Sequence, residues 1–489
     1  MMKKKFSFNL KDNPILRTDS YKYSHKFQLR KGTQRIWSYI EPRSFLQGAP
    51  DYIVAAGFNM FIKEYLLAPF SQTDIDDAAI FCEMHGEPFA REDFEYILKE
   101  HNGHWPIEIR AVAEGTVLKT SNIILSAENT DERVPWTTAW LETIILRGIW
   151  PMSTVATIST RIRNLVQQYI NCTSDNPDQL LFKLHDFGAR GVSSGESARY
   201  CGAGHLIPFR GTDTVEAIAA VIDYYDCSEM PGYSIPAAEH STITSWTKDG
   251  EVEAYRNMIN TFGGEGKLYA VVSDSYDIFS AIKNIWCKEL KEEVLAKGGT
   301  VVIRPDSGIP YRVVLECLEL LGDGFGYEIN SKGYKVLHPA VRIIQGDGIN
   351  YNSILKILQT MEDAGWAIDN VTFGMGGALQ QHMDRDWYGW AMKCSATKIN
   401  DEWIDVYKDP ITDIKKHSKR GRLALIMEDD ELTTVSQDMA IGFAKEDYLI
   451  PIFRNGKVLV DPTFDEVSST YENSAYLFFN KNKNNQMCK

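Results

Sequence analysis

The chain has 489 residues, of which 66 are acidic and 52 are basic, so its formal net charge is −14 at pH 7. This charge disfavours a nucleic-acid polymer or an anionic membrane as a partner, because both repel a negatively charged protein. Hydrophobic residues at 44% and charged residues at 24% are ordinary globular values, which excludes a largely disordered or low-complexity chain.

The N-terminus and the cysteines indicate a soluble, cytoplasmic protein. Residues 1–5 precede no apolar signal-peptide core, and no later stretch approaches the roughly 18 apolar residues of a membrane span. The eight cysteines are scattered, with no C-x-x-C pair and no Cys/His cluster at zinc spacing. We therefore expect free thiols and no structural metal, while a magnesium ion carried by a phosphorylated substrate stays open.

The first third of the chain has the pattern of an α+β region. Strand-like runs at residues 35–40 and 107–112 alternate with shorter helical segments within residues 1–145. Apolar residues at helical spacing then predict long helices within residues 136–170. These helices lead into a second domain.

Strand-like patterns return near the C-terminus. Residues 391–395 read as a strand, and Asn455-Gly456 predicts a hairpin turn. We expect residues 390–489 to complete the N-terminal α+β domain, with a polar, frayed end from Asn480 onward.

A repeated unit fills the expected middle domain, residues 146–389: a short apolar strand ends in a polar or glycine cluster and a helix follows. The strand ends are residues 185–188, 211–213, 238–240, 273–275, 304–308, 345–348 and 374–377. Strands that alternate with helices indicate a parallel sheet. Seven strand ends with polar or glycine clusters favour a closed barrel over an open sheet, because closing the sheet brings all seven ends to one pocket. The expected fold is α/β: an irregular, TIM-like barrel with a second α+β domain.

Two strand ends carry residues suited to a flat ligand. An isolated Phe187 would more often be a core residue, but Arg190 follows three positions later, and an aromatic plate beside a guanidinium suits a ring attached to a phosphorylated group. Asp213 is equally suited to cap the next helix or to bind a ligand. As a ligand contact it would accept hydrogen bonds from an amide NH2 and repel a carboxylate.

Three further strand ends carry a histidine or a carboxylate. A lone histidine is usually structural, but His240 lies at a strand end, where a neutral imidazole suits acid/base work or phosphoryl acceptance. Either Ser241 or Thr242 is available to cap the helix that follows. Asp306 and Asp347 stand beside glycines that let a ligand approach the backbone, and sugar hydroxyls need such acceptors.

Phosphate-binding candidates come last in the chain. Gly376 and Gly377 offer backbone N–H groups at a helix start, and Arg385 adds charge eight residues after Gly377. The densest basic run, residues 415–422 with Lys408 nearby, is either a solvated loop or a screen for a polyphosphate.

Several long motifs stand in order along the chain. They are residues 18–22 (TDSYK), 183–191 (KLHDFGARG), 211–214 (GTDT), 235–242 (IPAAEHST), 303–308 (IRPDSG) and 418–423 (SKRGRL). On these motifs the sequence resembles the type II phosphoribosyltransferases that act on nicotinamide. The resemblance covers essentially the whole chain. It implies an irregular α/β barrel on a domain made from both termini, and a homodimer with active sites shared between subunits.

The resemblance also implies an activity and a set of site residues. The activity is transfer of a phosphoribosyl group from phosphoribosyl pyrophosphate to nicotinamide in NAD salvage, giving nicotinamide mononucleotide and pyrophosphate. Mg²⁺ comes with the substrate, and ATP stimulates the reaction by phosphorylating His240. Phe187 and Tyr21 of the partner subunit would sandwich the pyridine ring, while Asp213 would bind its carboxamide.

The remaining implied contacts are grouped by the part of the substrate they would meet. The ribose and its pyrophosphate would be surrounded by Arg304, Asp306, Gly346 and Asp347, with Arg190 and Asp274 close by. The 5′-phosphate would be held by Gly376, Gly377 and Arg385. The polyphosphate would lie near Arg43, Lys393, Lys408 and Lys416. One position departs from the family pattern, because Ala270 stands where a serine is expected. The missing hydroxyl leaves open how far position 270 contributes to selecting the amide substrate.

Three rival functions remain to be weighed. A nicotinate-specific enzyme of the same fold is disfavoured by Asp213, since a carboxylate repels a carboxylate substrate. A nucleotide sensor without activity is disfavoured by the acidic and basic groups at the strand ends. A Schiff-base aldolase needs a lysine at a strand end, and none of the seven clusters has one.

Overall fold

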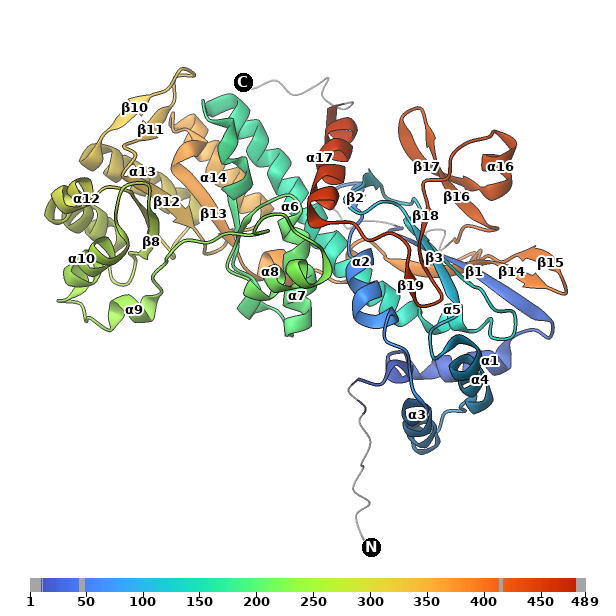
Figure 1. Ribbon diagram of the computed structural model, residues 1–489. Helices are drawn as coiled ribbons and strands as arrows, with labels where there is room; N and C mark the ends of the chain where they lie inside the picture. The colour runs from blue at the N-terminus through green and yellow to red at the C-terminus, as the bar shows by residue number, and fades with distance from the viewer. Residues whose placement is uncertain (1–9, 11, 44–48, 413–416, 481–489) are drawn as a thin grey trace, which may run out of the picture. The chain divides into compact units, whose positions relative to one another are not determined.

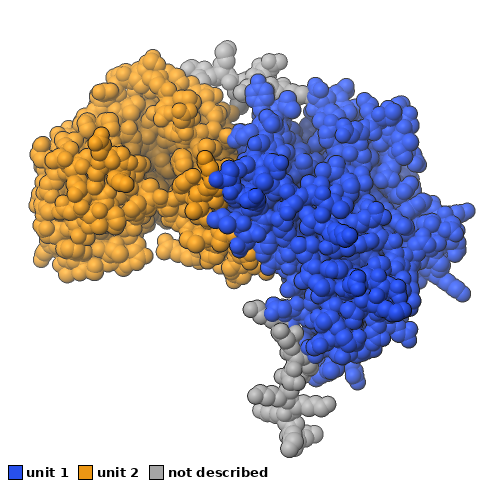
Figure 2. All heavy atoms as spheres, in the orientation of Figure 1, with its two compact units in different colours: residues 1–157, 221–228, 384–485 blue, residues 158–220, 229–383, 486–489 orange. Residues whose placement is uncertain are grey.

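The structure, a computed structural model, describes residues 10, 12–43, 49–412 and 417–480. The chain divides into two compact units, shown in different colours in Figure 2. Unit 1 comprises residues 1–157, 221–228 and 384–485, and unit 2 comprises residues 158–220, 229–383 and 486–489. Each unit therefore combines segments that are distant in the sequence.

Unit 1 is built on a seven-stranded antiparallel sheet in the order β15–β14–β1–β5–β3–β18–β19 (Figure 1). The strands are β1 (Thr33–Glu41), β3 (Ile107–Ala111), β5 (Leu125–Asn129), β14 (Ala391–Ile399), β15 (Glu402–Asp405), β18 (Ile450–Arg454) and β19 (Lys457–Val458). Two smaller antiparallel pairs join β2 (Tyr52–Val54) to β4 (Val117–Lys119) and β16 (Leu423–Glu428) to β17 (Glu431–Ser436). As predicted, C-terminal strands complete a sheet begun by N-terminal ones.

The helices of unit 1 come from both ends of the chain. They are η1 (Pro14–Leu16), η2 (Ser20–Ser24), α1 (His25–Gln28), α2 (Phe58–Phe61), η3 (Ile62–Leu66), α3 (Gln72–His85), α4 (Arg91–His101), α5 (Thr137–Trp140), η8 (Arg385–Trp387), α16 (Gln437–Gly442) and α17 (Phe464–Asn480). Helix α6 (Glu142–Thr173) begins in unit 1 and ends in unit 2. The strands expected at 35–40 and 107–112 and the helices expected within 136–170 are thus confirmed. The predicted turn Asn455-Gly456 joins β18 to β19 with φ of 49° and 79°.

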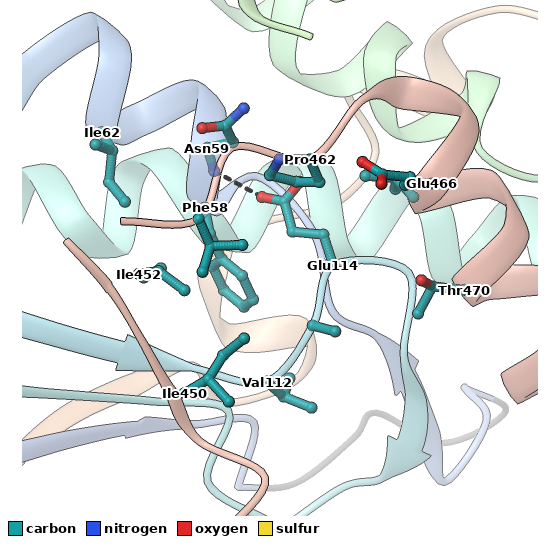
Figure 3. A pocket seen from close by; sticks show the side chains of 13 residues that line it. Phe58, Asn59, Ile62, Val112, Glu114, Ile450, Ile452, Pro462, Glu466 and Thr470 are labelled. Carbon is teal, nitrogen blue, oxygen red and sulfur yellow. Dashed lines mark hydrogen bonds between the residues drawn. The ribbon is translucent and has the colours of Figure 1, made fainter. Parts of the chain in front are cut away.

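A small, mostly apolar cavity of about 70 Å³ lies in unit 1 beside a buried carboxyl group (Figure 3). Glu114 Oε1 accepts a hydrogen bond from the Asn59 backbone N–H at 2.7 Å, and Oε2 accepts one from the Tyr225 hydroxyl at 2.8 Å. Burial raises the pKa of Glu114 to about 7, although these donors and the charge of Lys63 oppose the rise. The carboxyl therefore holds α2 and the segment 221–228 together inside the unit.

Unit 2 is built on a six-stranded parallel sheet that curves as a half-barrel, in the order β7–β6–β13–β12–β9–β8 (Figure 1). The strands are β6 (Leu184–Asp186), β7 (Gly211–Thr212), β8 (Leu268–Val272), β9 (Thr300–Arg304), β12 (Val341–Gln345) and β13 (Val371–Met375). A short antiparallel pair joins β10 (Tyr327–Ile329) to β11 (Lys335–Leu337). The alternation of strand and helix in the sequence thus predicted the parallel sheet correctly.

Segment 233–238 hydrogen bonds to both edge strands of this sheet. Gly211 of β7 pairs with Tyr233, and Ala270 of β8 pairs with Ala237, each in parallel orientation. The Ala270 N–H donates to Pro236 at 2.8 Å. All seven predicted strand ends therefore follow segments that pair in parallel with one another, namely the six strands and segment 233–238.

The helices of unit 2 follow the strands in sequence. They are η4 (Pro177–Phe182), η5 (Ala189–Gly191), α7 (Gly195–Leu206), α8 (Val215–Tyr224), α9 (His240–Thr244), α10 (Glu251–Phe262), α11 (Ile278–Ser280), η6 (Ala281–Glu289), α12 (Lys291–Lys297), α13 (Pro310–Phe325), α14 (Tyr351–Asp363), η7 (Ile368–Asn370) and α15 (Gly377–Gln380). Helix α8 ends in residues that belong to unit 1. Each strand leads into a helix or a turn, so its carboxyl end opens into a loop.

The sheet of unit 2 is buried on both faces, as parallel sheets are. Ala270, Val302 and Ile344 form one cluster with the partly buried Phe187 and Ile235. The next residue along each strand points to the opposite face, because side chains alternate along a strand, and it is also buried. The first face leads directly to Phe187 at a strand end.

The expectation that the cysteines are all free thiols is wrong. Cys172 is disulfide-bonded, whereas the other six described cysteines are free. Sequence spacing alone does not reveal which sulfurs the fold brings together. Residues 1–5, Cys488 and the polar end 481–489 lie outside the described residues.

Within the described ranges, no helix is long and apolar enough to cross a membrane.

Candidate active site

The predicted ring plate, Phe187, stands immediately after β6 and is held by close contacts with two glycines. Its backbone N–H donates to Met375 of β13 at 3.0 Å. A Cβ at Gly374 would lie 2.0 Å from the Phe187 ring, and one at Gly346 would lie 3.2 Å from it. Only glycine at 374 leaves room for the ring, so β13 fixes the plane of this aromatic side chain at the strand ends.

Asp213 lies one residue beyond β7 and is bound by two donors on one oxygen. His185 Nε2 donates to Asp213 Oδ1 at 2.9 Å, and the Ser234 hydroxyl donates to the same oxygen. Burial raises the pKa of Asp213, but these hydrogen bonds and the charges of His185 and Arg304 outweigh it and hold the pKa below its ordinary value. Because no described residue donates to Oδ2, that oxygen is available to a ligand.

Asp213 is not the cap of the next helix. Ahead of α8, the Thr214 N–H donates to the Thr212 hydroxyl at 2.9 Å, so Thr212 supplies the local side-chain bond. The carboxylate of Asp213 points instead to residues on two neighbouring segments, His185 and Ser234. The cap interpretation is therefore wrong, and the ligand-binding role of Asp213 stays a prediction.

Arg304 and three carboxylates form a charged group at the ends of β8, β9 and β12. Arg304 Nη2 lies 3.1 Å from Asp306 Oδ2. Burial raises the pKa of Asp306, Arg304 lowers it, and the charges of Asp274 and Asp347 raise it further. These groups are therefore close enough to act on one another. Arg304 Nε is buried without a partner among the described residues, which leaves a donor for a ligand.

His240 is the first residue of α9 and shares a hydrogen bond with Asp274. Its Nε2 lies 2.9 Å from Asp274 Oδ1, with the histidine side chain 47% exposed and the aspartate 6% exposed. The helix is capped by Glu239, which forms a capping box with Thr242, and not by Ser241 or Thr242 as expected. The carboxylate thus binds one ring nitrogen of a histidine whose side chain stays about half exposed.

The glycine turn after β13 lies beside the loop after β6. Gly376 precedes α15, a helix of four residues that begins at Gly377. A Cβ at Gly191 would come within 3.4 Å of Gly377, so the two loops run close together. Arg190 is exposed in the same loop as Gly191. Arg385 belongs to unit 1, where it pairs with Asp386 at 2.8 Å.

The other predicted basic residues also belong to unit 1. Burial lowers the pKa of Lys393, the charge of Glu142 raises it, and the charges of Arg43, Lys22 and Arg385 lower it further, so these groups lie close enough to act on Lys393. Lys408 is exposed, and Lys416 lies outside the described residues. Tyr21, in η2, is 54% exposed and presents its ring edge-on to His25 at 4.9 Å.

Four functional candidates were not singled out in the sequence: His185, Ser234, Asp186 and Gln380. Ser234 and Gln380 meet a site residue only through pairing between segments that are far apart in the chain. His185 and Asp186 had a signal, because they stand directly before Phe187 in the first strand end. The His185 ring lies 5.2 Å from the Phe187 ring.

The chain is similar to known protein families and to solved structures. The nicotinate phosphoribosyltransferase family matches residues 182–449, and the N-terminal domain of nicotinamide phosphoribosyltransferase matches residues 13–109. A nicotinate-nucleotide pyrophosphorylase from Pyrococcus furiosus has a TM-score of 0.63 at 16% identity, covering 98% of this chain and 99% of that one. Human nicotinic acid phosphoribosyltransferase has a TM-score of 0.53 at 14% identity, covering 94% and 93%. Fold and family together define a phosphoribosyltransferase of type II fold.

The most informative relatives are similar along nearly the whole chain. Nicotinamide phosphoribosyltransferase of Xanthomonas campestris pv. campestris (strain 8004) is 48% identical over 467 residues, which cover 93% of this chain and 97% of that protein. The chain therefore belongs to the nicotinamide phosphoribosyltransferase family. The protein of that name from Acinetobacter baylyi is 30% identical over 490 residues, covering 93% and 96%.

Proposed function

We propose that the chain transfers the phosphoribosyl group of phosphoribosyl pyrophosphate to the ring nitrogen of nicotinamide. The products are nicotinamide mononucleotide and pyrophosphate, and the role is NAD salvage. The observation that carries the proposal is Asp213 Oδ2, an oxygen of a charged carboxylate that no described residue binds. Its other oxygen is oriented by His185 and Ser234.

Recognition of the amide follows from this geometry. The free oxygen accepts a hydrogen bond from the carboxamide NH2, whereas a nicotinate carboxylate would meet a like charge. Phe187 stacks on the pyridine ring and holds its nitrogen in line with the ribose, which contributes positioning. Ala270 lies in the cluster behind Phe187 and offers no hydroxyl, so the amide is selected at Asp213.

The charged group at Arg304 suits the ribose and its leaving group. The ring nitrogen attacks C1′ as the bond to pyrophosphate breaks, and the electron pair leaves with the pyrophosphate. Carboxylates of Asp306 and Asp347 stabilise positive charge on the sugar, and Arg304 and Arg190 stabilise the departing anion. Gly346 gives the backbone access to the ribose, and Gly376 and Gly377 hold the 5′-phosphate. The resemblance assigns Arg385 to the same phosphate, and that role stays a prediction.

A magnesium ion fits the residues present. Mg²⁺ is usually held by one or two carboxylates together with substrate phosphates. Asp306 and Asp347 are close enough for the charge of one to raise the pKa of the other. Arg304 Nε, which has no partner among the described residues, belongs to the same group. In the described part of the chain, no group of three or more His, Cys, Asp or Glu is placed to hold a metal alone. When bound with the substrate, the ion supplies positive charge to the pyrophosphate.

We propose further that ATP stimulates the reaction through His240. The Nε2–H of His240 donates a hydrogen bond to Asp274, so this tautomer leaves a lone pair on Nδ1. Nδ1 attacks the γ-phosphorus of ATP, the bond to the β-phosphate oxygen breaks, and ADP leaves with that electron pair. The resemblance assigns Arg43, Lys393, Lys408 and Lys416 to the polyphosphate, and that role stays a prediction. These cations would supply positive charge that the net charge of −14 for the whole chain conceals.

We also propose a closed barrel, a homodimer and three domain segments. Unit 2 forms an irregular α/β barrel, supported by the pairing of segment 233–238 with both edge strands. A cytoplasmic homodimer shares its active sites, with the exposed Tyr21 ring reaching the site of the partner subunit. The domains run over residues 1–145, 146–389 and 390–489.

The test is a pyrophosphate-release assay with phosphoribosyl pyrophosphate and either nicotinamide or nicotinate, each with and without ATP. We expect release with nicotinamide, stimulation by ATP, and release with nicotinate at least about tenfold slower, since one charge-assisted hydrogen bond contributes about 1.5 to 3 kcal/mol. No release with either base would contradict the proposal, and faster release with nicotinate would assign the chain to the rival substrate.

A further inference from the structure

Asp186, the last residue of β6, is a fully buried carboxylate that binds three loops at once. Its Oδ1 accepts the Gly188 N–H at 2.8 Å. Its Oδ2 accepts from Gln380 Nε2 at 2.5 Å and from the Thr212 hydroxyl at 3.4 Å. The three donors belong to the loop after β6, to α15 after β13, and to the end of β7.

The cluster is packed too tightly for the bonds to be incidental. A Cβ at Gly188 would lie 2.6 Å from the Gln380 side chain and 3.0 Å from Asp186 Oδ1, so glycine at 188 admits the Gln380 amide. Gln380 is itself 2% exposed, and its Oε1 has no partner among the described residues. Burying a charge and an orphaned amide oxygen costs several kcal/mol, a cost that an apolar pair would avoid.

Asp186 stands between two parts of the candidate site. Phe187, the ring plate, is the next residue in the chain, and its N–H donates to Met375 of β13. Gln380 ends the four-residue helix that begins at Gly377, so the amide that Asp186 holds lies one turn from the glycine turn. A shift of that hydrogen bond moves the glycine turn relative to the aromatic plate.

We infer that Asp186 is a positioning residue that, through Gln380, sets the distance between the base-binding plate Phe187 and the phosphate-binding turn at Gly376 and Gly377. The inference rests on the proposed function, which assigns the plate and the turn to opposite ends of one mononucleotide. Asp186 touches neither substrate, so its effect is on the alignment of the ring nitrogen with C1′ and appears in kcat more than in affinity for either substrate.

The test exchanges the two partners of the hydrogen bond. Asp186→Asn places an NH2 group among donors, Gln380→Glu places two carboxylates together, and Gln380→Met removes one donor without adding charge. The double variant Asp186→Asn with Gln380→Glu restores one donor and one acceptor with their places exchanged. We expect each single variant to lose about tenfold or more in kcat with KM changed less than about threefold, because a displacement near 1 Å can cost about 100-fold. The double variant should recover most of the loss.

Unchanged kcat in Gln380→Met, or a double variant no better than the worse single variant, would overturn the inference. If Asp186→Asn does not fold, as circular dichroism and thermal unfolding would reveal, Gln380→Met and the double variant still decide the matter. Failure of the proposed function is separate: it is inactivity of the parent protein in the pyrophosphate-release assay, whatever the variants do.

Discussion

Two carboxyl groups, one in each unit, show how surroundings decide what an acidic side chain does. Asp213 and Glu114 each accept two hydrogen bonds. The pKa of Asp213 is held below its ordinary value by His185, whereas burial raises the pKa of Glu114 to about 7. Both donors of Asp213 use one oxygen and leave the other for a ligand, while the donors of Glu114 occupy both oxygens. The first group is equipped for recognition and the second for holding segments together.

This distinction predicts that removing a polar group at the strand ends of unit 2 alters catalysis more than stability, and that a change at Glu114 alters stability with little effect on catalysis.

The largest effect is expected from Gly374→Ala. The added methyl group would lie 2.0 Å from the Phe187 ring, so the plate must move. We expect kcat/KM for nicotinamide to fall by about 100-fold, as a displacement near 1 Å can produce. Gly195→Ala is the matched control, because a Cβ there meets nothing within 4 Å. Full activity in Gly374→Ala would show that Phe187 does not bind the base.

His240→Ala tests the exposed histidine that begins α9. We expect basal turnover to persist and stimulation by ATP to disappear, since the variant has no nitrogen to accept a phosphoryl group. His85→Ala, a change at an exposed histidine of α3 in unit 1, serves as the control and should keep full stimulation. ATP stimulation that survives in His240→Ala would place the phosphoryl acceptor elsewhere.

Asp213→Asn tests the recognition half of the comparison. Without the charge, residue 213 no longer repels nicotinate, and its hydrogen bond to the nicotinamide NH2 is weaker. Both changes reduce the preference for nicotinamide over nicotinate. We expect the ratio of kcat/KM for nicotinamide over nicotinate to fall by about tenfold or more, which corresponds to about 1.4 kcal/mol. The two substrates are measured separately in initial-rate assays. An unchanged ratio would remove Asp213 from base selection.

Glu114→Gln tests the other half, and its effect is on stability. A glutamate whose pKa is about 7 in the folded protein and about 4.3 when unfolded binds its proton more tightly in the folded state, so its contribution falls as pH rises between those values. Between about pH 5 and pH 8 we expect the unfolding free energy of Glu114→Gln to rise by about 3 kcal/mol relative to the parent. Activity should change less than about twofold, because the protein stays folded when its unfolding free energy changes by this amount.

Urea unfolding at several pH values measures this difference, with Glu83→Gln as the control because Glu83 is exposed on α3. A pH-independent difference for Glu114→Gln would mean that Glu114 does not titrate in this range in the folded protein.

Much of the parallel sheet could be predicted because its signal is local. Strand, polar or glycine cluster, and helix recur along the chain, and parallel strands bring their carboxyl ends to one edge. This placed Asp213, His240 and Asp306 at strand ends before any contact was known. Their roles in catalysis, the subunit arrangement and the domain boundaries stay predictions.

What the sequence could not supply is pairing across distance. The bond from Ser234 to Asp213 depends on how segment 233–238 lies against β7, and that from Gln380 to Asp186 joins residues 194 positions apart. Glu114 carried no motif at all, since its role depends on burial beside the cavity. The disulfide at Cys172 and the cap at Glu239 were missed for the same reason: composition does not specify which groups meet.

The central claim is that a charged carboxylate at the end of β7 selects the amide over the acid. The most direct measurement gives the parent protein phosphoribosyl pyrophosphate with equal concentrations of nicotinamide and nicotinate, and identifies the mononucleotide formed by chromatography with mass detection. We predict that nicotinamide mononucleotide dominates by at least about tenfold, the factor that about 1.4 kcal/mol provides. Nicotinate mononucleotide as the main product would contradict the account.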